Sequence, residues 1–211
     1  MTGSMTKIDA YLDELYPNPK CELNYNKDYE LLLATMLSAQ TTDKRVNMVT
    51  NILFKKYPSL KDLSKANIND IINIIKPIGT YKKKSIFIKE ICTKLVKDNI
   101  TIIPNSRIYL ESLPGVGRKT TNVFLSVIYN IPTIAVDTHV ERVSKRLNLA
   151  KEEDTVLEVE QKLMKKLPQE KWSKLHHQLV FFGRYKCKSI NPDCTDCKLK
   201  NYCKYHKENS K

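Results

Sequence analysis

The residues of this chain that are best suited to chemistry lie in and around a turn that contains two glycines. Two of its five glycines, Gly115 and Gly117, stand on either side of Val116 in the run Leu-Pro-Gly-Val-Gly-Arg-Lys over residues 113–119. A chain this poor in glycine keeps it where the backbone turns sharply or approaches something closely. Helical patterns flank the turn, so the free N–H groups at the start of the second helix form a nest that suits a phosphate. The alternative is a plain helical hairpin whose glycines only let two helices pack.

An amine and a carboxylate accompany this turn. Lys119 directly follows Arg118 and lies four residues before Val123 on the apolar face of the second helix; Asp137 comes eighteen residues after Lys119. A nucleophilic amine beside a carboxylate, on a hairpin that grips phosphates, suits attack on a sugar carbon with Schiff-base formation. The segment Thr138-His139-Val140-Glu141 has the pattern of a capping box and predicts a helix that starts just after Asp137. Two plainer interpretations stay open, with Lys119 as an ordinary phosphate contact and Asp137 itself as the helix cap.

Four of the six cysteines are clustered near the end of the chain. They are Cys187, Cys194, Cys197 and Cys203, in the pattern C-x6-C-x2-C-x5-C. In a reducing compartment such a group binds metal, either as a closed zinc site or as the ligands of a [4Fe–4S] cluster. Only Cys194 and Cys197 are as close as the pairs of a zinc ribbon, so the spacing favours the cluster. The isolated Cys21 and Cys92 are expected to be buried as small apolar side chains.

Composition restricts the partners of the chain. Its 211 residues include 36 Lys and Arg against 23 Asp and Glu, a net charge of +13, which predicts a polyanionic partner such as nucleic acid. A merely soluble basic protein is the alternative. No apolar run is long enough to span a bilayer and the start lacks the pattern of a signal peptide, so we expect an intracellular protein. The first four residues resemble an expression scar and are left out of the predicted fold.

Helical spacing of apolar residues dominates the sequence, and strand patterns are nearly absent, which predicts an all-α fold. A second, weaker helix-turn-helix pattern surrounds Gly79, with three lysines over residues 82–84. These lysines indicate either a solvated helix start or a second contact with nucleic acid. The helices are expected over residues 29–37, 42–56, 68–75, 82–97, 106–113, 118–129, 140–147, 154–166 and 172–185.

Taken together, these motifs resemble the endonuclease III family of DNA glycosylase/AP lyases. The matching segments lie between about residue 20 and residue 203, and their order and combination are highly specific. They are Leu-Ser-Ala-Gln-Thr-Thr-Asp at 37–43, Ile-Gly at 78–79, the turn at 113–119 with Asn-Val at 122–123, Val-Asp-Thr-His at 136–139, His-His at 176–177, Gly-Arg-Tyr at 183–185 and the four clustered cysteines.

The resemblance implies a helix-hairpin-helix DNA glycosylase fold with two all-α domains. Residues 23–133 would form a six-helix barrel domain that holds the hairpin motif at about 106–130. Residues 5–22 and 134–211 would form a second domain, in which the four cysteines bind a [4Fe–4S] cluster.

The resemblance also assigns roles to single residues. Lys119 would be the nucleophile at C1′ of the sugar, and Asp137 the carboxylate that assists cleavage of the glycosidic bond. Gln40 would fill the gap left by the flipped-out nucleotide. The residues of the turn, from Gly115 to Arg118, would hold the DNA backbone.

Two departures from the family pattern concern DNA contacts. After Ile78 and Gly79, relatives commonly carry a bulky apolar wedge, whereas this chain has Thr80. The loop over residues 188–193, between the first two clustered cysteines, has one lysine and one aspartate where relatives are often more basic. Both wedge insertion and phosphate contacts of that loop are therefore expected to be weaker.

The implied activity is excision of oxidised pyrimidines from double-stranded DNA, followed by cleavage of the abasic site, by a monomer in the cytoplasm or nucleoid of a prokaryote-like cell. One rival is the adenine-specific mismatch glycosylase of the same superfamily. That group typically lacks the hairpin lysine, and the position of its catalytic glutamate aligns here with Thr35. The other rival is a non-catalytic DNA-binding module with a structural metal, which a nicking assay on abasic DNA would distinguish.

Overall fold

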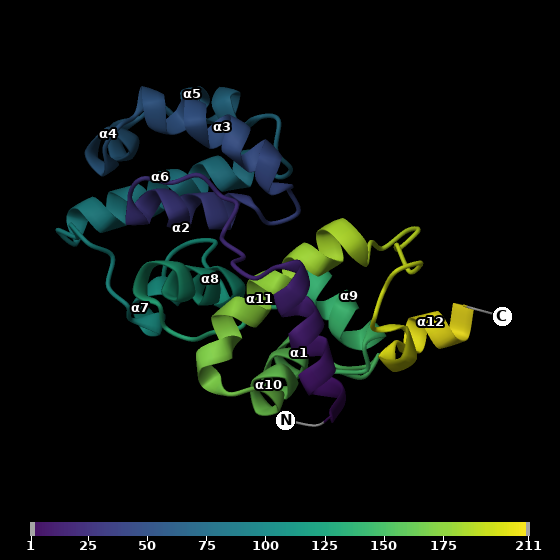
Figure 1. Cartoon of the computed structure of the whole chain (residues 1–211). Coiled ribbons are helices and arrows are strands. Elements are labelled where there is room, and N and C mark those ends of the chain that lie inside the picture. The colour runs from purple at the N-terminus through teal and green to yellow at the C-terminus, as the bar shows by residue number, and fades with distance from the viewer. Residues whose placement is uncertain (1–2, 210–211) are drawn as a thin grey trace. The chain divides into compact units, whose positions relative to one another are not determined.

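The computed structural model describes residues 3–209, and over this range the chain is built from helices without any strand (Figure 1). The α-helices are α1 (Gly3–Leu15), α2 (Asp28–Leu37), α3 (Asp43–Lys56), α4 (Leu60–Lys65), α5 (Ile68–Ile75), α6 (Tyr81–Lys97), α7 (Arg107–Glu111), α8 (Arg118–Tyr129), α9 (Thr138–Arg146), α10 (Val156–Lys166), α11 (Trp172–Phe181) and α12 (Lys204–Asn209). A π-helical turn at Phe182–Lys186 continues α11, and short 3-10 turns lie at Gln169–Lys171 and Lys200–Tyr202. None of the described helices is long and apolar enough to cross a membrane.

The chain divides into two compact units. One is Glu22–Phe124, and the other combines the residues up to Cys21 with those from Leu125 onward. This division falls inside α8, whereas the domain boundary expected from the sequence follows residue 133. The predicted domain limits therefore stay a prediction.

In the unit formed by Glu22–Phe124, α2 is the most enclosed helix. Every one of its residues from Tyr29 to Leu37 is buried, as expected for a helix that is apolar around its whole circumference. Helix α6 packs against α4 and α5, and α3 packs against α5 and α2. The turn between α2 and α3 carries Gln40, and the turn between α5 and α6 carries Thr80.

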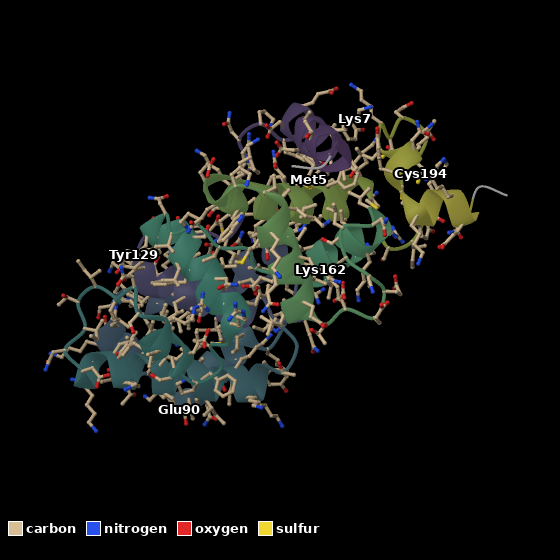
Figure 2. All side chains as sticks on the ribbon, turned by 90° about the horizontal axis from the view of Figure 1, so that it is seen from below. Met5, Lys7, Glu90, Tyr129, Lys162 and Cys194 are labelled. Atoms are coloured by element: carbon tan, nitrogen blue, oxygen red, sulfur yellow. The ribbon has the colours of Figure 1, made fainter. Side chains whose placement is uncertain are left out.

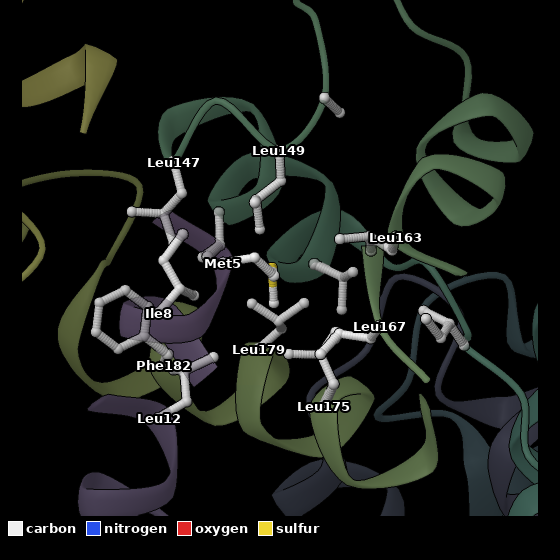
Figure 3. Packing of buried hydrophobic residues seen from close by; sticks show 14 of the residues in the cluster. Met5, Ile8, Leu12, Leu147, Leu149, Leu163, Leu167, Leu175, Leu179 and Phe182 are labelled. Carbon is white, nitrogen blue, oxygen red and sulfur yellow. The ribbon is translucent and has the colours of Figure 1, made fainter. Parts of the chain in front are cut away.

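The other unit has a core to which α1 contributes directly. Met5, Ile8 and Leu12 of α1 are fully buried and pack in one cluster with side chains of α9, α10 and α11 (Figure 3). Burying each such side chain stabilises a fold by about 1.5–3 kcal/mol. The expectation that residues 1–4 stand outside the fold is wrong for Gly3 and Ser4, which are the first residues of α1.

The two isolated cysteines differ in burial. Cys92 is fully buried, as expected, and burial raises the pKa of its thiol to about 12. Cys21 is only half-buried, so the same expectation is wrong there.

Candidate active site

The glycine turn is closed by its own backbone. The N–H of Val116 donates to the carbonyl of Leu113 at 3.1 Å, and Gly115 has φ = 73°. Proline at the second position of a turn and glycine with a positive φ at the third position are typical of a type II turn. A Cβ on Gly115 would lie 2.4 Å from a ring carbon of Phe87, so both backbone and packing require glycine there. Val116 itself is buried and anchors the turn through its N–H.

Gly117 has a different environment. Its carbonyl accepts the N–H of Thr121 at 3.0 Å, which makes it the residue that precedes the first turn of α8. A Cβ on Gly117 would meet no described atom within 4 Å, so the packing of the protein does not require glycine. The space beside Gly117 adjoins the first amides of α8, which have no partner within the helix. A phosphate could therefore approach this backbone closely.

Lys119 is the second residue of α8 and is half-buried. Asn122, one turn further on, is 1% exposed, and its Oδ1 accepts a hydrogen bond from Nη2 of Arg107 at 2.6 Å. The other nitrogen, Nη1 of Arg107, donates to Glu111 at 2.8 Å. Arg107 thus joins α7 to α8 next to the lysine and fixes the hairpin on both sides of its turn.

Asp137 is the N-cap of α9. Its Oδ1 accepts the N–H groups of His139 and Val140, each at 2.9 Å. The capping box predicted at Thr138 is therefore wrong, because the aspartate is a stronger cap one residue earlier. Both bonds end on Oδ1, which leaves Oδ2 out of the cap, so capping and a reactive role are compatible. Lys119 and Asp137 belong to different units, and their pairing stays a prediction.

One turn after the cap, Arg142 connects α9 to the cysteine segment. Its Nη2 donates to the carbonyls of Gly183 at 2.6 Å and Cys187 at 3.0 Å. The same nitrogen lies 3.3 Å from Nδ1 of His139, and burial lowers the pKa of that histidine. Arg142 is not among the residues expected from the sequence to be functional, although its spacing of four residues from Arg146, on the helix after Asp137, is visible there.

Gln40 and Thr80 share an unusual backbone conformation. Their φ angles are 56° and 55°, in the left-handed region that a β-branched residue such as Thr rarely adopts. The other non-glycine residues with positive φ among those described are all asparagines, which tolerate this region. Each such outlier costs about 1–3 kcal/mol and is typical of functional sites.

The two turns also lie close together. A Cβ built on Gly79 would be 3.8 Å from the carbonyl oxygen of Gln40. The side chains of Gln40 and Thr80 are exposed. The structure thus brings together Gln40, Gly79 and Thr80, three of the residues expected from the sequence to contact DNA.

Lys84 lies beneath these turns and is 4% exposed. Its Nζ donates to the carbonyls of Leu37 at 2.9 Å and Ala39 at 2.7 Å and reaches Oγ1 of Thr41 at 3.4 Å. Burial lowers the pKa of this ammonium group. Lys84 is therefore neither part of a solvated helix start nor placed to contact nucleic acid, the two interpretations of the lysines at 82–84. Its spacing of four residues from the buried Ile88 could have indicated that it is buried.

The four clustered cysteines line one cavity. Its other walls come from the residue that follows α9, the π-helical turn, the loop after Cys187 and the C-terminal segment. They are Leu147, Phe182, Pro192, Asp193, Lys200, Tyr205 and His206. Burial raises the pKa of the thiols of Cys197 and Cys203, so only a strong cation would hold them as thiolates. Among the described residues, no three His, Cys, Asp or Glu side chains converge closely enough to hold a single metal ion. The sulfurs instead surround a shared space.

Arg146 borders this cavity. Its Nη1 lies 3.4 Å from Sγ of Cys187 and donates to the carbonyl of Lys188 at 2.7 Å. Its guanidinium carbon lies 3.9 Å from the ring centroid of Tyr205. The first cysteine and the loop that follows it are therefore held against α9.

The segment with the other three cysteines contacts α1. The hydroxyl of Tyr11 donates to the carbonyl of Asp196 at 3.4 Å, and Nζ of Lys7 lies 5.6 Å from the ring centroid of Tyr202. Figure 2 labels Lys7 and Cys194 in this part of the unit. The tail is thus attached to the first helix of the chain.

The loop between the first two cysteines carries one acidic and one basic side chain. Its only aspartate, Asp193, lies 3.1 Å from Nζ of Lys186, and this ion pair lowers the pKa of the carboxyl group. Lys188 is the one lysine within the loop. Phosphate contacts of this loop therefore stay a prediction.

Comparisons with known proteins agree with this geometry. A family model described as HhH-GPD superfamily base excision DNA repair protein matches residues 33–169. Endonuclease III of Bacillus subtilis (strain 168) is 45% identical over 204 residues, which cover 95% of this chain and 93% of the relative. Endonuclease III of Escherichia coli (strain K12) is 39% identical over 199 residues, which cover 94% of each chain.

A solved structure of a trapped endonuclease III–DNA covalent intermediate, an estranged-adenine complex, is also similar to this chain. It matches with a TM-score of 0.94 and 42% identity and covers all of both chains. The fold and the hairpin define a protein of the HhH-GPD superfamily of base excision repair. Within that superfamily, the chain belongs to the endonuclease III family.

Proposed function

We propose that this chain is a bifunctional DNA glycosylase/AP lyase of base excision repair, which removes oxidised pyrimidines from double-stranded DNA and cleaves the abasic site. The observation that carries the proposal is a half-buried lysine in the first turn of α8, directly after the glycine turn. Its support is the full-length similarity to an endonuclease III that was trapped covalently on DNA.

In the proposed reaction, the amine of Lys119 attacks C1′ of the damaged nucleotide. A carbon–nitrogen bond to the lysine forms as the glycosidic bond breaks, and the base leaves with the bonding electrons and takes up a proton. The C1′–O4′ bond of the sugar ring then opens as a proton passes from the lysine nitrogen to O4′, which leaves an imine at C1′. Once protonated, this imine acidifies the proton on C2′. Loss of that proton and cleavage of the C3′–O bond release the 3′ phosphate by β-elimination, and water then frees the lysine.

Asp137 has the chemistry to assist the first of these steps. A carboxylate near C1′ stabilises the positive charge that develops on the sugar as the base departs. The cap bonds from His139 and Val140 hold the carboxylate in one orientation. Asp137 would therefore act with Oδ2 while Oδ1 stays bound to the helix.

DNA binding in this proposal depends mainly on phosphates. The net charge of +13 and the open backbone at Gly117 favour contacts with the strand, so affinity falls steeply as salt rises. Gln40 would occupy the gap that the flipped nucleotide leaves, with Thr80 beside it. Because one chain supplies each of these parts, we propose that it acts as a monomer.

The cysteine cavity fits a [4Fe–4S] cluster. Such a cluster is held through separate irons, so its four thiolates need not converge on one point as the ligands of a single zinc ion do. Cys187, Cys194, Cys197 and Cys203 would be the ligands. When bound, the cluster supplies a crosslink between the tail and the rest of the unit, and the proposed reaction does not need its redox chemistry.

Borohydride trapping tests the proposal, because it reduces the imine to a stable adduct between protein and DNA. The Lys119→Gln variant should lose trapping and strand cleavage but keep duplex binding, since the hairpin backbone and Arg118 remain. Lys82→Gln, which removes an exposed lysine at the start of another helix, should trap as the wild type does. Duplex binding by a wild-type protein that neither traps nor nicks would instead establish the non-catalytic DNA-binding module.

Asp137 can be tested without losing its cap. Asparagine also caps helices well, so Asp137→Asn should keep the stability of α9 yet slow base release more than cleavage of a preformed abasic site. Asp137→Ala should likewise slow base release more than cleavage of the preformed abasic site, and it should also lower the free energy of unfolding by about 1 kcal/mol. Equal slowing of both reactions by Asp137→Asn would remove the carboxylate from the glycosidic step.

A further inference from the structure

Lys84 carries a buried ammonium group that the proposed reaction does not use. A buried charge is costly unless it is well solvated by the protein. The three bonds that the structure gives to Nζ of Lys84 go to oxygens without a formal charge, two carbonyls and a hydroxyl. A lysine kept in this setting for stability alone would be better replaced by an apolar side chain, so its bonds point to a positional role.

All three acceptors belong to the turn that carries Gln40. Leu37 is the last residue of α2, where a cation also stabilises the negative end of the helix dipole. Ala39 and Thr41 are the two neighbours of Gln40. The ammonium therefore holds the backbone on both sides of a residue whose φ of 56° is otherwise unfavourable.

The same lysine is joined to the second turn through its backbone. The N–H of Lys84 donates to the carbonyl of Thr80 at 3.0 Å, in the first turn of α6. One residue thus connects the two left-handed turns, by its side chain to the Gln40 turn and by its main chain to the Thr80 turn.

We propose that Lys84 is a positioning residue that fixes the left-handed Gln40 turn, so that the glutamine side chain is set to enter the gap in the duplex. This rests on the proposed function of Gln40 as the gap-filling residue. Lys84 touches no DNA in this proposal and acts only through the backbone of residues 37–41.

The first test measures the turn itself and needs no activity. Lys84→Met keeps a long side chain but removes the donors, so the Thr41 amide, which bonds to the carbonyl of Ser38 at 3.1 Å, should exchange its hydrogen at least tenfold faster. Lys89→Met is the matched control on the same helix, because Lys89 donates to the carbonyl of Ala66 at the end of α4. Unchanged exchange at Thr41 in Lys84→Met, or an equal change in Lys89→Met, would overturn the proposal.

The second test asks whether Lys84 acts through Gln40. In single-turnover excision of a paired lesion, Lys84→Met and Gln40→Ala should each slow the reaction, and the double variant should be no slower than Gln40→Ala alone. If the rate reductions of the two single variants instead multiply in the double variant, Lys84 acts independently of Gln40 and the proposal is overturned. Cleavage of an abasic site in single-stranded DNA, where no gap exists, should change less than twofold in Lys84→Met.

Failure of this inference can be separated from failure of the proposed function. If wild-type protein does not trap on abasic DNA, the lyase assignment is wrong whatever the exchange data show. If it traps and the exchange at Thr41 is unaltered in Lys84→Met, only the role of Lys84 is wrong. If Lys84→Met does not fold, the exchange test uses Lys84→Arg, which keeps the charge but cannot place a single nitrogen among the three acceptors. Faster hydrogen exchange at the Thr41 amide is again expected. Unchanged exchange would overturn the role of Lys84.

Discussion

The glycine hairpin and the cysteine tail are built on opposite principles. The hairpin is complete in the protein alone, since Val116 closes the turn, Phe87 packs against Gly115 and Arg107 joins its two helices. The tail over residues 187–203 has little regular structure and surrounds a cavity with four sulfurs. We expect its folding to depend largely on the group that those sulfurs would hold.

The difference indicates where each region is vulnerable. A preformed hairpin loses little conformational entropy when it binds phosphate. A substitution that distorts the hairpin should therefore weaken all DNA binding. A tail organised by ligation takes much of its folding free energy from the bound group, so damage to one ligand should spread through the tail and its contacts with α1.

The largest expected effect is loss of a cluster ligand. Purified wild-type protein should be brown and contain about four irons per chain, whereas Cys203→Ala should lose the iron and the folded tail. Cys21→Ala, which removes a cysteine outside the cavity, should keep the iron. Stoichiometric zinc without iron in anaerobically purified wild-type protein would contradict the assignment.

Substitutions of the two hairpin glycines should separate folding from binding. Gly115→Val places side-chain atoms against Phe87 at a positive φ and should lower the free energy of unfolding by about 3 kcal/mol. Gly117→Val has room and should cost about 1 kcal/mol or less. Both should weaken binding to damaged and undamaged duplexes alike, as measured by fluorescence anisotropy. Weakening confined to one lesion would contradict the role of the hairpin in holding the backbone.

A smaller effect is expected from the two left-handed turns. Gln40→Ala should slow excision of a paired lesion about tenfold, the equivalent of 1.4 kcal/mol. Thr80→Ala should change the same rate less than twofold, because a threonine is too small to act as an effective wedge. The opposite order in a single-turnover assay would identify the Thr80 turn as the true wedge.

The smallest effect concerns the surface of the tail. Nζ of Lys198 lies 2.6 Å from the carboxylate of Glu14 in an exposed ion pair between the tail and α1. Such pairs contribute about 0–1 kcal/mol, so Lys198→Ala should leave iron content and stability nearly unchanged. Loss of iron in this variant would show that surface contacts, rather than ligation, organise the tail.

The sequence predicted the elements with strong local patterns. The bounds of α8 agree with the expected 118–129, and the expected helix over 42–56 is α3 with Thr42 as its cap. The hairpin glycines were found because glycine itself indicates unusual backbone.

Other features had no such local signal. The left-handed turns at Gln40 and Thr80 contain neither glycine nor asparagine at that position, so tertiary contacts must impose them. Lys84 was grouped with two exposed lysines, although it lies on the buried face of α6. The cap of α9 was misplaced by one residue because Asp137 and Thr138 are both good caps and only the three-dimensional structure distinguishes them.

The most direct measurement locates the covalent bond. Wild-type protein is trapped with borohydride on an oligonucleotide that carries an oxidised pyrimidine, digested, and analysed by mass spectrometry for the peptide that holds the sugar remnant. We expect the adduct on Lys119, at the start of α8. An adduct on any other amine would contradict the assignment of Lys119 as the nucleophile.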